Sequence, residues 1–257
     1  MIAFLYDKTF DGLLAVVFDA YTEQRFPDVL LGPEDILPIP VSAPHQVVTS
    51  KEKSERVAKG LAKKLSRKAM SGLMLAWLSE EPGADLAVLR YIRKVFDQKR
   101  SPEHDLADPD ILAVAKLAKK TGTEVHKLAG FVRFQKTAQD VYFAALSPRH
   151  NVLPLLLSHF TDRFADQRWI LYDLGRRYGF FFDGKDIQDV FLDEQLARQI
   201  ERQQGKLDSS LLAEHEPLFQ ALWKSYFKAT AIQERINPRL QRRCMPRRYW
   251  EYLTEKH

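Results

Sequence analysis

Two pairs of short aromatic and β-branched segments flank one helical segment in the middle of the chain, and they constrain the fold most. Three residues separate Phe131–Thr137 from Val141–Leu146, and a short turn separates Trp169–Asp173 from Tyr178–Asp183. Paired segments of this kind predict hairpins. Asn151–Phe164 lies between the pairs and has helical spacing. We therefore predict an antiparallel strand–strand–helix–strand–strand layer.

The remainder of the chain reads as mainly helical. Residues 2–6 predict a strand, and five prolines make residues 26–46 an extended loop that packs down and pairs as edge strands. Gly122 is expected to end a helix that begins at residue 109. Further helices are predicted at 13–21, 51–79, 85–98, 186–204, 209–235 and 246–254. The predicted fold is α+β, with a small central antiparallel β layer surrounded by helices and a helical C-terminal part.

The length of 257 residues is compatible with one large domain or two closely joined ones. We expect a single domain over residues 1–257. A possible subdivision separates a mostly helical part (1–129), a β-rich core (130–185) and a helical basic part (186–257). Hydrophobic residues make up 45% of the chain, which is enough to build a core.

Several kinds of chemistry lack the residues that they need. Cys244 is the one cysteine, so an internal disulfide, a cysteine-based zinc site and a self-held iron–sulfur cluster are excluded. The seven histidines show no helical zinc spacing, and no phosphate-loop, dinucleotide or nucleophile-elbow motif occurs. We expect no metal and no cofactor, and no catalytic residue is assigned. The sequence leaves open whether the chain is an enzyme and favours binding.

The N-terminal residues MIAFLYDKTF lack the basic and apolar regions of a signal peptide. Apolar runs are shorter than the roughly 18 residues that a membrane span needs. We therefore expect a cytoplasmic protein without membrane contact.

Positive charge is concentrated in two blocks, although the net charge is only +5. The lysine block, Lys51–Met70, holds eight Lys/Arg against Glu52 and Glu55. The arginine block, Arg235–Arg248, holds six arginines and no acid. Concentrated positive charge attracts polyanions such as DNA. For the lysine block, simple solvation of a helix surface is the favoured interpretation.

The arginine block is the first candidate nucleic-acid site. Tyr249, Trp250 and Tyr252 follow it closely, and arginine and aromatic side chains together bind phosphates and bases. The alternative is a C-terminal helix held by acidic partners within the protein. The residues that we expect to contact phosphates are Arg239, Arg242, Arg243, Arg247 and Arg248.

A second candidate site surrounds the carboxyl-edge loop, Ser147–Asn151, which follows a predicted strand and precedes a helix. The beginning of a helix favours anions, and Arg149 and His150 add positive charge there. Arg133, Arg176 and Arg177 are the other basic groups of the β layer. An ordinary strand-to-helix turn, and core packing of the neighbouring aromatic residues, are the alternatives.

Four stretches spread over the chain resemble a bacterial family of unknown function whose members are described as probable DNA metabolism proteins. They are YDKTFDGLLAVVFDAY (6–21), EVHKLAGFVRFQ (124–135), WILYDLGRRYGFFFDG (169–184) and ERINPRLQRRCMPRRYWEYLTE (234–255). The resemblance implies a companion of a radical-SAM protein that modifies or repairs DNA. Some family members are fused to a uracil-DNA glycosylase-like domain. No catalytic residue is carried over by the resemblance.

Together these features predict an accessory nucleic-acid-binding protein in DNA repair or base modification, with DNA and a radical-SAM protein as partners. One alternative is a DNA-acting hydrolase or glycosylase-like enzyme with dispersed active-site residues. A cleft that joins the Arg149–His150 loop to Asp173 or Asp183 would favour that enzyme. The other alternative is a protein-interaction module whose arginines contact an acidic partner.

Overall fold

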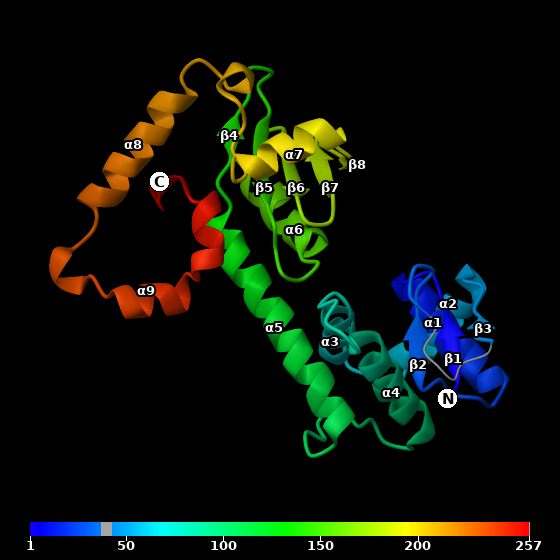
Figure 1. Ribbon diagram of the computed structural model, residues 1–257. Coiled ribbons are helices and arrows are strands. Elements are labelled where there is room, and N and C mark those ends of the chain that lie inside the picture. The colour runs from blue at the N-terminus through cyan, green and yellow to red at the C-terminus, as the bar shows by residue number, and fades with distance from the viewer. Residues whose placement is uncertain (37–42, 257) are drawn as a thin grey trace. The chain divides into compact units, whose positions relative to one another are not determined.

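The computed structural model describes residues 1–36 and 43–256 and divides the chain into two compact units, Met1–Thr123 and Glu124–His257 (Figure 1). Both units combine helices with a small sheet, which confirms the α+β class. The elements of the first unit are β1 (Ala3–Leu5), α1 (Phe10–Thr22), β2 (Val29–Leu31), β3 (His45–Gln46), α2 (Lys51–Ala62), α3 (Arg67–Trp77), α4 (Ala84–Asp97) and the larger part of α5 (Pro109–Phe131).

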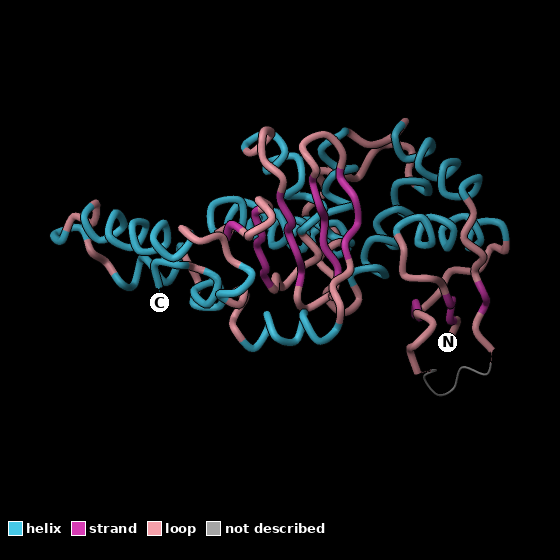
Figure 2. The backbone as a smooth tube through the Cα atoms, turned by 90° about the horizontal axis from the view of Figure 1, so that it is seen from above, coloured by secondary structure: helices cyan, strands magenta, loops and turns pink. Residues whose placement is uncertain are grey.

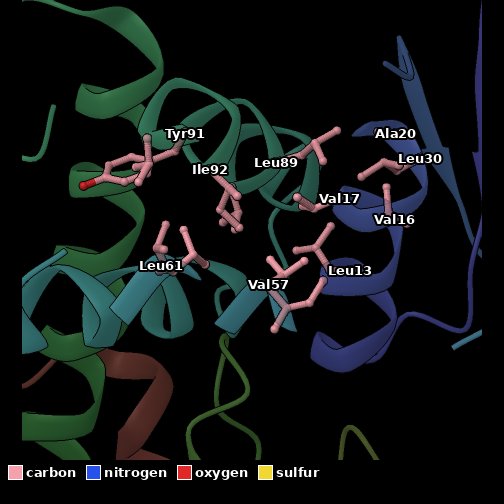
Figure 3. Close-up of a cluster of buried hydrophobic side chains, with 14 of the residues drawn as sticks. Leu13, Val16, Val17, Ala20, Leu30, Val57, Leu61, Leu89, Tyr91 and Ile92 are labelled. Atoms are coloured by element: carbon pink, nitrogen blue, oxygen red, sulfur yellow. The ribbon is translucent and has the colours of Figure 1, made fainter. Parts of the chain in front are cut away.

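The first unit contains a three-stranded parallel sheet with the order β2-β1-β3. Its flanking strands come from the proline-rich segment, as predicted for that loop, while Leu37, Ile39 and Val41 lie outside the described residues. Helix α1 begins after Thr9, whose hydroxyl accepts a hydrogen bond from the Gly12 amide. Apolar side chains of α1, α2 and α4 meet in one buried cluster (Figure 3). That cluster stabilises this unit.

The second unit is built on a five-stranded sheet with the order β4-β5-β6-β7-β8. Its elements are β4 (Gln135–Lys136), β5 (Tyr142–Leu146), α6 (Leu153–Arg163), β6 (Trp169–Asp173), β7 (Tyr178–Phe182), β8 (Ile187–Val190), α7 (Glu194–Arg202), η1 (Ser209–Leu211), α8 (Glu216–Ala229), η2 (Gln233–Arg235), α9 (Pro238–Cys244), η3 (Arg247–Tyr252) and η4 (Thr254–Lys256). Figure 2 shows the strands side by side.

The prediction of a wholly antiparallel layer is wrong at the centre of this sheet. Strands β5 and β6 pair in parallel, from Tyr142 opposite Trp169 to Leu146 opposite Asp173. Helix α6 connects them, because parallel neighbours need a crossover connection. The pairs β4–β5, β6–β7 and β7–β8 are antiparallel. The two predicted hairpins are therefore joined through a parallel strand pair.

Helices cover both faces of this sheet. On one face, α6, the end of α5 and Tyr249 pack against Leu146, Trp169 and Leu171. On the other face, Ile200 of α7 packs against Tyr172. This packing on both faces fixes the positions of β5 and β6, and therefore of their carboxyl ends.

Several boundaries differ from the prediction, and two of the differences have a clear physical reason. Helix α5 runs through Gly122 to Phe131, because Thr121 and Glu124 are buried on its core side. A glycine inside a helix costs about 1 kcal/mol, which such packing can exceed. Strand β8 replaces the start of a predicted helix. Its IQDV sequence is an exposed edge strand, which is held by backbone hydrogen bonds to β7 and has no apolar periodicity that would have predicted it.

Helices α8 and α9 extend beyond the sheet of the second unit (Figures 1 and 2). Apolar side chains of α8 remain exposed, including Leu218, Phe219, Leu222 and Tyr226. In the part of the chain that the structure describes, no helix combines the length and the apolar character that crossing a membrane requires.

Candidate nucleic-acid interface

The carboxyl ends of the parallel strands β5 and β6 lie side by side, because Leu146 is opposite Asp173. The carboxyl-edge loop leaves β5 at this point, and the turn Leu174–Arg177 leaves β6. Ligands of sheets with parallel strands commonly bind outside this end of the strands. The structure therefore brings Arg149, His150, Arg176 and Arg177 to one edge of the sheet.

A buried carboxylate from α5 holds the carboxyl-edge loop. The Glu124 side chain is 2% exposed and accepts hydrogen bonds from the backbone amides of Arg149 (3.2 Å) and His150 (2.9 Å). The His150 ring is also buried, with its Nε2 atom 4.0 Å from the same carboxylate. Because it is buried, His150 helps to position the loop, while Arg149 is exposed.

A second buried carboxylate holds the turn after β6. Asp173 accepts hydrogen bonds from the Gly175 and Arg176 amides and from the Arg176 guanidinium, at 2.9, 3.1 and 2.9 Å. Burial raises the pKa of Asp173 above its ordinary value, and these hydrogen bonds offset only part of that rise. The Arg176 guanidinium also donates to the carbonyl oxygens of Pro148 and Arg149. Arg176 therefore ties the two loops together.

The arginine block reaches this edge through its last residues. The Tyr249 hydroxyl donates to Glu124 Oε1 at 2.7 Å, and Arg248 Nη2 lies 3.5 Å from the same oxygen. Burial and the hydrogen bond to Glu124 raise the pKa of Tyr249, so its phenol stays protonated. The two candidate sites predicted from sequence are thus joined at Glu124.

Four further arginines of the block are exposed on α9 and η3. Arg239, Arg242 and Arg243 recur at helical spacing on α9, and Arg247 lies over the Trp250 ring at 5.8 Å. Within residues 1–36 and 43–256, none of these four guanidinium groups forms an ion pair with an acidic side chain. These four positive charges therefore face solvent, whereas Arg248 is paired inside the protein with Glu124.

Arg133 and Arg177 form ion pairs with acidic residues of the protein. Both oxygens of Glu255 accept hydrogen bonds from Arg133, whose guanidinium also donates to the Gly130 and Val132 carbonyls. Arg177 forms an ion pair with Glu201. These contacts assign a structural part to both arginines, although Arg177 remains at the carboxyl edge.

Sequence reasoning missed the two carboxylates that organise these arginines. Glu124 lies beyond Gly122, where the predicted helix was expected to end, and Glu255 lies in the last turn of the described chain. Burial alone distinguishes them, since single Glu residues carry no signal in a sequence. A groove of about 660 Å³ beside α9 was also not predicted from the sequence. Its lining includes His126, Lys127, His159 and Cys244.

The two aspartates named for the enzyme alternative both hold turns of the second unit. Asp173 is fully buried and holds a turn, and Asp183 accepts hydrogen bonds from the Lys185 and Asp186 amides of its own turn. No group of three or more His, Cys, Asp or Glu side chains with the arrangement of a metal site occurs among the described residues.

Comparison with known proteins yields one family match and one distant structural likeness. No curated protein matches the chain. A pGpG-specific phosphodiesterase from Vibrio cholerae, PggH, is similar in structure with a TM-score of 0.31 and 10% identity, over 90% of this chain and 99% of that chain. A TM-score this low supports no conclusion about fold or activity. Residues 82–255 match a family described as a domain of unknown function, and because this is more than half of the chain, the protein belongs to that family, DUF4130.

Proposed function

We propose that the protein binds nucleic acid through the arginine block and the adjoining carboxyl-edge loop, as an accessory protein in DNA repair or base modification. The observation that carries this proposal is the exposure of Arg239, Arg242, Arg243 and Arg247 without ion-pair partners in the described chain. A guanidinium group without an internal acidic partner can donate two parallel hydrogen bonds to the oxygens of one phosphate.

The carboxyl-edge loop supports the same proposal. Glu124 and the Asp173–Arg176 pair fix its backbone, so that exposed Arg149 sits on a rigid loop near Arg248. Groups that are held in place lose little entropy when a ligand binds. We propose that Arg149 and Arg248 add phosphate contacts to those of α9.

A DNA partner and a radical-SAM partner are parts of this proposal that rest on the family resemblance. In this scheme the chain positions the DNA and the partner carries out the chemistry. Incubation of lesion-containing oligonucleotides with the chain alone, and with the partner enzyme, tests this division. Product formed by the chain alone would instead support the enzyme alternative.

The direct test is DNA binding by the double variant Arg242→Ala/Arg243→Ala. We expect its affinity for a duplex at about 0.1 M salt to fall about ten-fold or more, since two phosphate contacts are removed. Arg198→Ala/Arg202→Ala removes the same charge from exposed positions of α7 and is the matched control. Equal affinities for the two double variants would contradict the proposal.

A further inference from the structure

A groove of about 470 Å³ lies between α8 and the start of β5, and aromatic rings form much of its lining. Phe134 and Tyr142 contribute rings from the side of the sheet, and Phe219 and Trp223 from α8. Phe219 is 60% exposed and Trp223 38% exposed. Its volume falls within the range of about 300–1,000 Å³ that is usual for small-ligand sites.

A carboxylate lies in this aromatic groove. Glu216 is 7% exposed, and its Oε1 atom accepts a hydrogen bond from Gln220 Nε2 at 3.0 Å. A carboxylate can accept about four hydrogen bonds, so acceptor capacity remains for a ligand. A flat ring with an N–H group on its edge matches both the aromatic walls and this acceptor.

The charges around the groove do not suit a phosphate group. Lys136 lies 5.6 Å from the centre of the Tyr142 ring but forms an ion pair with Asp140. Arg133 lies 5.4 Å from the Trp223 ring centre and is paired with Glu255. Both cations are thus balanced by acids, and Glu216 adds a negative charge. The geometry therefore favours an uncharged ring over an anion.

The aromatic surface continues along α8 toward the arginines. Phe219, Trp223 and Tyr226 recur at helical spacing, and the rings of Trp223 and Tyr226 are 5.8 Å apart with an angle of 32°. Exposed Lys228 follows on the same helix, and η2 then leads to α9. Exposed aromatic rings beside cations are typical of surfaces that bind single strands, because bases stack on such rings.

We propose that the aromatic groove binds an unpaired nucleobase of a single strand, stacked against Phe219 and Trp223 and donating an N–H hydrogen bond to Glu216. The inference rests on the proposed function, since the arginines of α9 supply the phosphate contacts. It adds a preference for unpaired bases, because base pairing and stacking in a duplex cover the faces and edges that this groove would contact.

The test compares a single-stranded oligonucleotide with an abasic oligonucleotide of the same length, which keeps the phosphates and lacks the bases. Wild-type protein is expected to bind the normal oligonucleotide about ten-fold more tightly or better, given the usual strength of one or more base–aromatic stacks. Phe219→Leu removes an exposed ring and retains apolar volume, and it should lose most of this preference. Phe219→Tyr retains a ring and should keep it.

Binding to duplex DNA serves as the internal control, together with thermal unfolding of each variant. Both Phe219 variants should bind duplex as wild-type protein does, because the arginines are unchanged. Equal wild-type affinity for normal and abasic strands, or an unchanged preference in Phe219→Leu, would overturn the inference and leave the proposed function intact. That result is also the one expected if a protein occupies this surface. Failure of wild-type protein to bind any of these nucleic acids would overturn the proposed function itself.

Discussion

The lysine block and the arginine block carry the same formal charge, but their side chains make different contacts. In the lysine block, Lys51 and Lys59 pair with Glu55, and Lys53 pairs with buried Asp19. Lys64 donates to three carbonyl oxygens at the end of α4. The other four basic residues are exposed and have no acidic partner among the described residues; they are Arg56, Lys63, Arg67 and Lys68.

In the arginine block, by contrast, Arg248 is the member that pairs with an acidic residue among those described. Two segments with equal formal charge can therefore differ in how many of their charged side chains are engaged within the protein. Half of the basic residues in the lysine block contact acceptors within their own unit, whereas most of the arginine block remains available to a ligand. Substitutions in the two blocks should therefore change different measured quantities.

The largest effect on stability is expected at the anchor of the carboxyl-edge loop. Glu124→Ala removes the acceptor of two backbone amides and of the Tyr249 hydroxyl, and it leaves these groups buried. We expect the free energy of unfolding to fall by about 3 kcal/mol or more. Urea denaturation measures this change, with the exposed Glu214→Ala as a control that should be close to neutral.

Lys64→Met and Arg243→Met should show that the two blocks differ in their contribution to stability and to DNA binding. Lys64→Met removes hydrogen bonds to the Val95, Phe96 and Gln98 carbonyls and should lower the free energy of unfolding by about 1–2 kcal/mol. Arg243→Met should change it by less than about 0.5 kcal/mol, because the side chain is exposed. DNA affinity should respond in the opposite order, and a loss of stability in Arg243→Met would remove the contrast.

The pH dependence of stability should identify Glu255 as an internal partner of Arg133. Burial raises the pKa of Glu255, but the hydrogen bonds from Arg133 and Trp223 outweigh it and hold the pKa below the ordinary value of 4.5. A lowered folded-state pKa stabilises the protein above the unfolded pKa, and this stability is lost as the pH falls through the folded value. Wild-type protein should therefore lose more stability than Glu255→Gln between about pH 5 and pH 2.5. Parallel curves would contradict this assignment.

The smallest effect is expected for Lys51→Ala and Lys59→Ala. The Lys51 side chain is 90% exposed and lies 3.9 Å from Glu55, and Lys59 is 74% exposed. Exposed pairs of this kind contribute about 0–1 kcal/mol. Thermal unfolding should hardly change, and a large shift would indicate that the lysine block has contacts beyond those described.

The sequence predicted much of the fold because local patterns encode it. Aromatic and β-branched pairs predicted β5, β6 and β7, and apolar spacing predicted α1, α4 and α6. The parallel pairing of β5 and β6 was not predicted, because the sequences of two strands do not show whether they pair parallel or antiparallel. The continuity of α5 through Gly122 was not predicted either, since tertiary packing outweighs one unfavourable residue.

The site was harder to predict than the fold. Clusters of arginine are visible in a sequence, so Arg242 and Arg243 could be proposed at once. Whether an arginine is occupied depends on a carboxylate that is distant along the chain, as with Arg133 and Glu255, which are 122 positions apart. Glu124 likewise gains its position only when the loop after β5 packs on α5.

The most direct test of the account is the salt dependence of duplex binding by wild-type protein and by two double variants. Each phosphate contact contributes about −0.9 to the slope of log affinity against log salt concentration. We predict that Arg242→Ala/Arg243→Ala makes this slope shallower by up to about 1.8, because two such contacts are lost. Lys51→Ala/Lys59→Ala should leave the slope as it is in wild-type protein. An unchanged slope in the arginine variant, or an equal change in both variants, would contradict the claim that the arginine block is the one available to nucleic acid.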